Sequence, residues 1–218
     1  MITTVIFDMD GVLINSEPVH QRHEREMYEE LGLQLSFEEQ QSFVGMSAMD
    51  SWKVVIDKYN LDFTPHELLL RGRGKYLKVL NETDEVKMIE GAMDLLSMLE
   101  RSGYHLLLAS SATSVTVGAV LKKFELLNIF PLFIGGDMVH NSKPNPDIFL
   151  KIAELAQVKA EECVVIEDAE HGVTAANNAG MKSIGFQNHH SGNQNLSNAD
   201  IIVDDLDQIS IDLLKGLR

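Results

Sequence analysis

Short, continuous apolar runs of strand length recur along this chain, and they are separated by amphipathic stretches of helical period. Because the runs do not alternate with polar residues, they are typical of strands that are buried on both faces. Helices are predicted over residues 92–102, 146–157 and 170–179, the first and last followed by a glycine. Strand and helix in alternation predict an α/β fold, a doubly wound parallel sheet with right-handed crossovers and helices on both faces. The runs are "TVIF" to Phe7, "YHLLLAS" to Ser110, "LFIG" to Gly135, "CVVIE" to Glu167, "SIGF" to Phe186 and "IIV" to Val203.

Residues 16–81 interrupt this alternation. Four helices are predicted there, over 17–31, 36–43, 47–59 and 65–81, and the last begins with a capping box of Thr64 and Glu67. We therefore expect a helical cap domain at 16–81, inserted into an α/β core formed by 1–15 and 82–218. Gly72 and Gly74 lie inside the last of these helices, where each costs about 1 kcal/mol relative to alanine. Close helix packing is a simpler explanation for them than function.

The charge of the chain limits its partners. Acidic residues number 33 and basic residues 18, for a formal net charge of -15, so nucleic acid and anionic membranes would be repelled. No apolar run approaches membrane-spanning length, and the N-terminal residues do not resemble a secretion signal. The single cysteine, Cys163, lies in an apolar run and is interpreted as a small buried hydrophobic residue. We expect a cytoplasmic monomer that acts on a small molecule.

Polar side chains gather where the predicted strands end. In open parallel sheets, ligands bind outside the carboxyl ends of the strands. An isolated "DMDG" would be ordinary turn chemistry, but four coincident strand ends indicate a functional site. The candidate residues are Asp8 and Asp10 after the first run, Ser110 at the end of the second, Lys143 in a loop after the third, and Glu167 with Asp168 at the fourth.

The charges of these residues predict a metal ion and a reaction. Four carboxylates bring about -4 into one region, which Lys143 and a divalent cation would largely neutralise. Mg²⁺ fits better than zinc, because no cluster of cysteine or histidine accompanies the oxygens. A cation, a lysine, a hydroxyl and a free carboxylate are the groups that phosphoryl transfer needs. One aspartate can attack phosphorus while another exchanges protons with the leaving oxygen and with water. Because residues two positions apart in an extended segment point to the same side, Asp8 and Asp10 can face one substrate.

The stretches "DMDGVL", "LLLASSAT", "SKPNPDIF" and "VIEDAEHGVTAA" resemble, in order and spacing, the four motifs of the haloacid dehalogenase (HAD) superfamily. The whole chain is similar to its β-phosphoglucomutase-like branch, which has a Rossmann-like core and a helical cap. This resemblance implies that Asp8 is the nucleophile, Asp10 the general acid/base, Ser110 a phosphate hydrogen-bond donor and Lys143 a clamp. It also implies that Mg²⁺ is bound by Asp8, the backbone carbonyl of Asp10 and Asp168, with Glu167 either a further ligand or a partner of the ligands. Asp10 disfavours dehalogenation, because the dehalogenases of the superfamily lack it.

The choice between hydrolysis and mutase activity depends on the cap. In β-phosphoglucomutase a cap arginine holds a second phosphate, and "GMSAMD" has Ala48 at the matching position; a sugar-binding lysine there corresponds to Gly72. Since a methyl group cannot replace a guanidinium, we favour a phosphatase acting on a small phosphorylated metabolite such as a sugar phosphate. A sugar phosphate mutase is the alternative. A receiver-like phospho-switch without enzymatic activity is a third, disfavoured by the chain length and by Asp10.

Four further residues are candidate substrate contacts: Ser111, His20, Gly45 and Trp52. For each of the last three another interpretation stays open, namely a surface histidine, a turn glycine and a tryptophan of the cap's core. Asp137 is either a neighbour of Lys143 or an ordinary loop acid. Residues 187–199 are polar and predict a surface loop.

Overall fold

The chain divides into two compact units. A computed structural model describes residues 1–36, 38–39, 43 and 48–217. One unit comprises Met1–Glu17 and Val86–Arg218, and the other comprises Pro18–Glu85. The sequence predicted the insert at 16–81. The first is called the core unit below and the second the cap unit.

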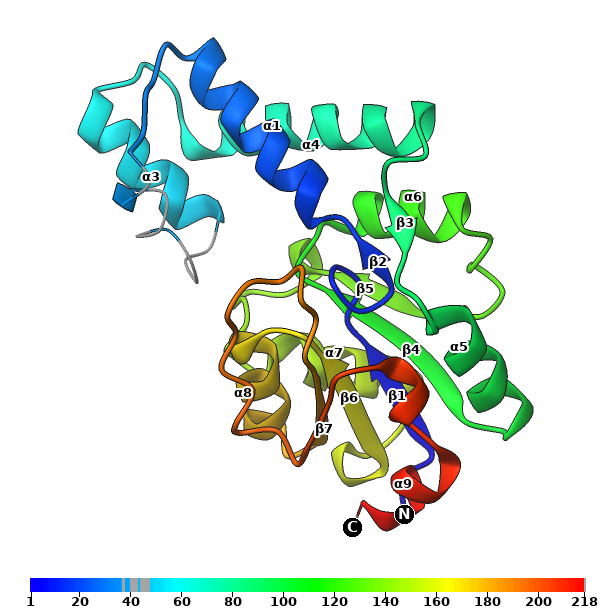
Figure 1. Cartoon of the computed structure of the whole chain (residues 1–218). Helices are drawn as coiled ribbons and strands as arrows, with labels where there is room; N and C mark the ends of the chain where they lie inside the picture. The colour runs from blue at the N-terminus through cyan, green and yellow to red at the C-terminus, as the bar shows by residue number, and fades with distance from the viewer. Residues whose placement is uncertain (37, 40–42, 44–47, 218) are drawn as a thin grey trace. The chain divides into compact units, whose positions relative to one another are not determined.

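A six-stranded parallel sheet organises the core unit, with the strand order β5-β4-β1-β6-β7-β8 (Figure 1). Each of the six predicted apolar runs forms one of these strands. The strand β1 lies in the middle, where Phe7 pairs with Leu108 of β4 and with Ile166 of β6. One residue further along the chain, Asp8 therefore emerges beside the ends of both neighbours. The strands are β1 Thr4–Phe7, β4 His105–Ser110, β5 Phe133–Gly135, β6 Cys163–Glu167, β7 Lys182–Phe186 and β8 Ile201–Val203.

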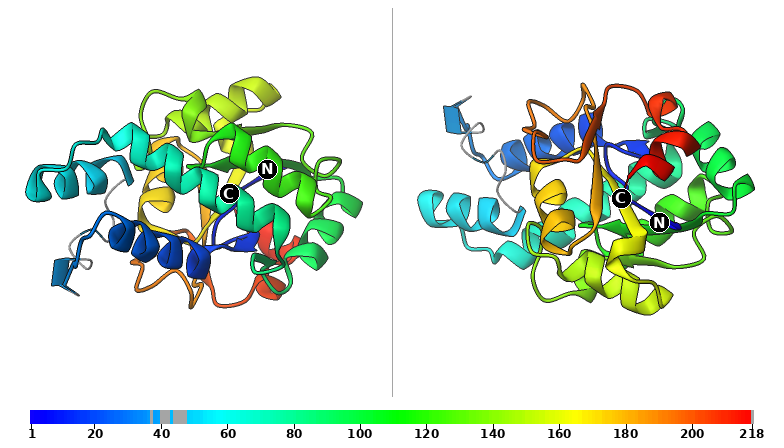
Figure 2. Two further views of the ribbon diagram at one scale, coloured as in Figure 1. Left: turned by 90° about the horizontal axis from the view of Figure 1, so that it is seen from above. Right: turned by 90° about the horizontal axis from the view of Figure 1, so that it is seen from below.

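Helices cover both faces of this sheet, as the sequence predicted (Figure 2). Alternate residues of β1 point to opposite faces. Ile6 packs in a cluster with apolar side chains of α7 and α8, whereas Phe7 meets Phe130 edge to face, with ring centroids 5.7 Å apart. The helices are α5 Ala92–Arg101, α6 Ser114–Lys123, α7 Asp147–Ala156, α8 Glu170–Asn178 and α9 Ile211–Gly216, with short 3-10 turns at Gly136–Met138, Ala160–Glu162 and Leu206–Gln208.

One small structural element of the core unit was not predicted. Strands β2 (Ile14–Asn15) and β3 (Lys87–Met88) form an antiparallel pair near the two places where the chain passes between units. Ile89 then donates a backbone hydrogen bond to the carbonyl of Leu13, 2.9 Å away. This pair brings the two connecting segments together at the core unit.

The cap unit is built from α1 (Glu17–Glu30), α3 (Ala48–Tyr59) and α4 (Pro65–Glu82). Its small core contains Met27, Tyr28, Trp52, Val55 and Leu68. Half of the predicted helix at 36–43 lies outside the described residues. The predicted capping box at the start of α4 is confirmed, because Thr64 and Glu67 each accept a hydrogen bond from the other's backbone N–H.

The two glycines of α4 differ in their surroundings. A Cβ atom on Gly72 would lie 3.3 Å from Sδ of Met27, which is closer than ordinary van der Waals contact. Gly72 therefore permits the close packing of α4 on α1 that the sequence predicted. Nothing lies within 4 Å of the same position on Gly74, and the structure offers no explanation for that residue.

Candidate active site

The turn after β1 places Asp8 and Asp10 at the carboxyl edge of the sheet. Asp8 continues the strand pairing, since its backbone N–H donates to the carbonyl of Ile166 over 3.0 Å. Gly11 then reverses the chain with φ of +81°, a value that glycine adopts readily, and its N–H donates to the carbonyl of Ile14. The turn therefore needs a glycine directly after Asp10.

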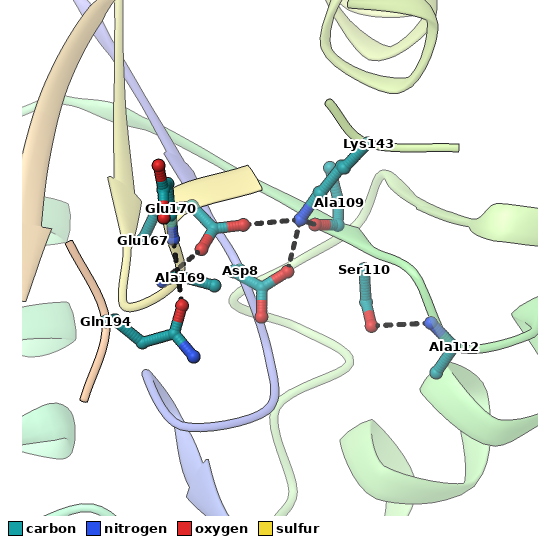
Figure 3. A network of polar contacts seen from close by, with 9 residues as sticks. All are labelled: Asp8, Ala109, Ser110, Ala112, Lys143, Glu167, Ala169, Glu170 and Gln194. Atoms are coloured by element: carbon teal, nitrogen blue, oxygen red, sulfur yellow. Dashed lines mark hydrogen bonds and ion pairs between the residues drawn. The ribbon is translucent and has the colours of Figure 1, made fainter. Parts of the chain in front are cut away.

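A buried lysine holds the carboxylate of Asp8. The Nζ atom of Lys143 donates to Oδ1 of Asp8 over 2.5 Å and to Oε1 of Glu167 over 2.7 Å, with a longer contact of 3.4 Å to the carbonyl of Ala109 (Figure 3). The side chain of Lys143 is only 7% exposed, and its ammonium lies over the ring of Phe149. An ammonium group has three donors, and three oxygens receive them here.

The residues around Lys143 carry more negative than positive charge. Burial raises the pKa of Asp8 to about 7; the ammonium of Lys143 opposes this shift, and the charges of Glu167 and Asp10 add to it. Burial also raises the pKa of Asp168, with further contributions from Glu167 and Asp8. For Lys143, burial alone would lower the pKa, but the Asp8 and Glu167 carboxylates outweigh burial and raise it. Among the described residues, the ammonium of Lys143 thus lies close to the buried carboxyl groups of Asp8, Glu167 and Asp168.

Glu167, at the end of β6, is the partner of Lys143. Its Oε2 atom also accepts a hydrogen bond from the backbone N–H of Ala169 over 3.0 Å. Helix α8 approaches this carboxylate so closely that a Cβ atom on Gly172 would lie 1.8 Å from Oε1. Both oxygens of Glu167 thus have protein partners. Of the two roles that the sequence left open, this geometry favours a partner of the ligands over a direct ligand.

Asp10, Ser110 and Ser111 lie at the same edge of the sheet. Oδ1 of the half-buried Asp10 accepts a hydrogen bond from the hydroxyl of Ser16, a residue that the sequence did not indicate. Ser110 is buried, and its Oγ accepts from the backbone N–H of Ala112 over 3.0 Å (Figure 3). Ser111 is exposed in the loop after β4. The structure thus brings Asp8, Lys143, Glu167 and Ala109 into direct contact and places Ser110 one residue further along β4.

Asp137 was predicted to be either a neighbour of Lys143 or an ordinary loop acid, and the structure gives it a different role. Its carboxylate accepts hydrogen bonds from the backbone N–H of Ser114, at 2.6 Å, and from the hydroxyl of the same residue, at 2.8 Å. Ser114 is the first residue of α6, where an acidic partner is favourable. Asp137 therefore stabilises the start of a helix.

The candidate substrate contacts of the cap unit are only partly described. His20 stacks on Tyr76, with ring centroids 4.6 Å apart and an interplanar angle of 11°. Trp52 is 7% exposed and packs against Tyr28 in the core of the cap unit, which favours the packing interpretation over a substrate contact. Gly45 lies outside the described residues. The substrate-binding roles of His20, Gly45 and Trp52 stay predictions.

The loop over residues 187–199, which we predicted from the sequence to be a surface loop, contacts this site. Asn188 donates from Nδ2 to the carbonyl of Gly11 over 2.8 Å, and the hydroxyl of Ser191 donates to Oδ2 of Asp168. These contacts join segments that are far apart in the sequence, so no local pattern indicates them. The available signal was positional, because the loop follows the carboxyl end of β7 and therefore lies at the same edge of the sheet as Asp8.

The donor set fits Mg²⁺. Asp8 and Asp168 supply carboxylate oxygens, and their pKa values are raised chiefly by burial, with the charge of Glu167 adding to both shifts. Among the described residues, no group of three or more His, Cys, Asp or Glu side chains is arranged to hold a metal by itself. Mg²⁺ typically takes one or two carboxylates and completes its shell with water and phosphate oxygens.

Comparison with known proteins agrees with this arrangement. Residues 5–186 match the family of haloacid dehalogenase-like hydrolases. The chain belongs to this family. A crystal structure of β-phosphoglucomutase from Clostridium difficile superposes with a TM-score of 0.82 and 25% identity, covering 99% of this chain and 96% of that one. The predicted superfamily, branch and fold are confirmed.

Two relatives are informative about the type of enzyme. The fructose-1-phosphate phosphatase YqaB of Escherichia coli is 28% identical over 189 residues, which are 83% of this chain and 94% of that protein. The chloroplastic protein SUPPRESSOR OF QUENCHING 1 of Arabidopsis thaliana is 35% identical over 220 residues, covering 99% of this chain. This chain spans 21% of that longer protein. With phosphatases among its homologues, the HAD-type phosphatase assignment is confirmed at the level of the enzyme class.

The predicted cytoplasmic location stays a prediction, since one relative is chloroplastic. In the part of the chain that the structure describes, no helix is long and apolar enough to cross a membrane.

Proposed function

We propose that the protein is a Mg²⁺-dependent phosphatase that hydrolyses a small phosphomonoester, of the sugar phosphate class, through an aspartyl-phosphate on Asp8. The observation that carries this proposal is the buried ammonium of Lys143, 2.5 Å from Oδ1 of Asp8 and 2.7 Å from Glu167. Such a contact favours the ionised form of a carboxylate that burial would otherwise protonate. An ionised and oriented Asp8 is what nucleophilic attack on phosphorus requires.

In the first step, a carboxylate oxygen of Asp8 forms a bond to phosphorus and the ester P–O bond breaks. Asp10 gives its proton to the leaving alcohol oxygen, as a general acid. Ser110 accepts from the N–H of Ala112, so its own hydroxyl proton is available to a phosphate oxygen. Lys143 adds positive charge next to the nucleophile.

In the second step, water attacks phosphorus, Asp10 takes the water proton, and the bond between phosphorus and the Asp8 oxygen breaks. Inorganic phosphate leaves and both aspartates return to their initial states. The different partners of the two aspartates support this division of labour. Asp10 accepts a hydrogen bond from the neutral hydroxyl of Ser16, whereas Asp8 accepts one from the ammonium of Lys143.

Asp8 and Asp168 would hold Mg²⁺, together with the backbone carbonyl of Asp10 that the family resemblance indicates. When bound, the cation supplies positive charge that stabilises the negative charge developing on the phosphate. Glu167 accepts a hydrogen bond from Lys143 and so keeps the ammonium next to Asp8.

The cap unit supports hydrolysis over mutase activity. Ala48, the first residue of α3, is exposed and offers no charge where the resemblance places an arginine. Gly72, where it places a lysine, has Sδ of Met27 3.3 Å from the position of a Cβ. The nearby cations Arg71 and Lys75 each lie 2.6 Å from the carboxylate of Glu30. Water is therefore the acceptor that we favour for the phosphoryl group.

A sugar phosphate mutase is the second candidate, favoured by the likeness to a β-phosphoglucomutase structure. A phospho-switch is the third. The substrate, a monomeric state and the absence of nucleic acid and membrane partners are part of the proposal; they rest on the net charge of -15 and on the small-molecule chemistry of the site.

The test measures phosphate release from a panel of phosphomonoesters with Mg²⁺, including β-glucose 1-phosphate with glucose 1,6-bisphosphate. We expect release of phosphate by the wild type and its loss in Asp8→Asn, which keeps the shape of the side chain. Release that persists in Asp8→Asn would overturn the nucleophile. Formation of glucose 6-phosphate without net phosphate release would identify a mutase, and a long-lived phosphoenzyme without turnover would identify a switch.

A further inference from the structure

The loop over residues 187–199 is anchored to the turn that carries the aspartates. Asn188 is 5% exposed, and its Nδ2 donates to the carbonyl of Gly11 over 2.8 Å. Its Oδ1 accepts from the backbone N–H of His190 over 2.9 Å, and its own N–H donates to the carbonyl of Phe186. A buried amide with these partners fixes the start of the loop, because leaving any of them unpaired would be costly.

Further hydrogen bonds fix the position of Ser191. Its backbone N–H donates to the carbonyl of Asn188, and its own carbonyl accepts from Nε2 of Gln194 over 3.1 Å. Oε1 of Gln194 accepts in turn from the N–H of Glu170, the first residue of α8 (Figure 3). Ser191 is therefore tied both to the turn after β1, through Asn188, and to the helix that follows Asp168.

The hydroxyl of Ser191 reaches Asp168 from this fixed position. It donates to Oδ2, while Oδ1 of Asp168 receives no hydrogen bond from any residue that the structure describes. Gly11 also approaches this oxygen, since a Cβ atom on Gly11 would lie 1.9 Å from Oδ2 and 2.8 Å from Oγ of Ser191. Asp168 is thus held by one oxygen and leaves the other open.

We infer that Ser191 is a positioning residue for Asp168, which selects the carboxylate oxygen that is presented to the cation. The inference rests on the proposed Mg²⁺ site. Residues that orient a metal-binding carboxylate typically affect metal affinity by about 10- to 100-fold when they are removed. The polar loop after β7 is thereby part of the catalytic apparatus and more than a surface connection.

The test compares Ser191→Ala with Ser197→Ala, an exposed serine of the same loop whose hydroxyl makes no hydrogen bond with any residue that the structure describes. Mg²⁺ affinity is measured by calorimetry on the full chain without any phosphate ester, and thermal stability is measured in EDTA. We expect Ser191→Ala to weaken Mg²⁺ binding by about tenfold. Ser197→Ala should match the wild type, and Ser191→Thr, which keeps the hydroxyl, should recover most of the affinity.

Three outcomes would overturn the inference: wild-type Mg²⁺ affinity in Ser191→Ala, an equal loss in Ser197→Ala, or a wild type that binds no Mg²⁺. A lower thermal stability of Ser191→Ala with unchanged Mg²⁺ affinity would show a purely structural role. Because the measurement needs no substrate, it is separate from the test of function. A wild type that binds Mg²⁺ but hydrolyses no ester would overturn the proposed function and leave this inference standing.

Discussion

Gly11 and Asp168 approach each other so closely that a Cβ atom on Gly11 would lie 1.9 Å from Oδ2 of Asp168. The first residue belongs to the turn after β1 and the second follows β6, so two strand ends meet here without an intervening side chain. The same glycine has φ of +81°, which side chains rarely adopt. A glycine is therefore required for two separate reasons.

Gly11→Ala should lower both stability and Mg²⁺ affinity. The backbone conformation alone costs about 1 to 2 kcal/mol with a side chain. Displacing Asp168 adds to that loss and moves a proposed ligand. Urea unfolding and calorimetry with Mg²⁺ measure the two effects, and we expect the affinity to fall by at least about tenfold.

Gly103→Ala is the matched control for this change. Gly103 has φ of +80°, and nothing lies within 4 Å of the position of a Cβ. It should show the backbone cost alone, with unchanged Mg²⁺ affinity. Equal losses of stability in the two variants, or wild-type affinity in Gly11→Ala, would contradict the steric role of Gly11.

Lys143→Met should strongly destabilise the protein without metal. The substitution leaves Asp8, Glu167 and Asp168 buried without their cation, and breaking a buried ion pair in this way costs about 3 to 5 kcal/mol. Urea unfolding in EDTA measures the change. Adding Glu167→Gln to the same variant should restore part of the stability, because it removes one of the unpaired charges.

The control for Lys143→Met is Lys151→Met. Lys151 makes an exposed ion pair with Glu154 on α7, at 2.9 Å, and exposed pairs contribute about 1 kcal/mol at most. A similar loss in both variants would mean that the buried ammonium does not neutralise the site as described.

The sheet was predictable because its central strands, such as β1 and β6, are buried on both faces. Each continuous apolar run, such as the one from Cys163 to Glu167, became a strand, and the rule that ligands bind at carboxyl ends predicted Asp8, Ser110 and Asp168 as candidate site residues. Strands β2 and β3 were not predicted, because each has only two residues and is too short to show a hydrophobic pattern. Helix α6, Ser114–Lys123, was not singled out either, although Thr113 caps it.

The missed site residues share a physical cause. Ser16, Asn188 and Ser191 are ordinary polar residues whose roles depend on contacts with distant segments, and such contacts leave no local signal. The role of Glu167 was left open for the same reason. Only the three-dimensional position of Lys143, between Asp8 and Glu167, favours one alternative.

Cys163 should resist alkylation in the native protein. Its thiol is fully buried, its Sγ donates to the carbonyl of Lys159, and burial, with the charge of Glu162, raises its pKa to about 11. Thiolate is the reactive form, so the thiol should be inert to iodoacetamide near neutral pH and react once urea unfolds the chain. Mass spectrometry after alkylation measures this. Rapid modification of the native protein would contradict the burial of β6.

The stabilisation that Mg²⁺ provides should grow with pH. The pKa of Asp8 rises from 3.8 to about 7 on folding without metal, chiefly through burial. A carboxyl group with a raised pKa contributes stability that is present below its unfolded pKa and is lost as pH rises through the folded value. Between about pH 4 and pH 7 the metal-free protein therefore loses this contribution, while the ionised form that binds the cation becomes populated.

Thermal unfolding in EDTA and in Mg²⁺ measures this difference. The rise in Tm on adding Mg²⁺ should be larger at about pH 8 than at about pH 5.5, because at the lower pH a proton competes with the cation for Asp8. Asp8→Asn replaces the ionisable carboxyl group by a neutral amide. It should therefore reduce both the size of the Tm rise and its dependence on pH. A Tm increase that is equal at both pH values, or that Asp8→Asn leaves unchanged, would mean that Mg²⁺ is not bound by Asp8.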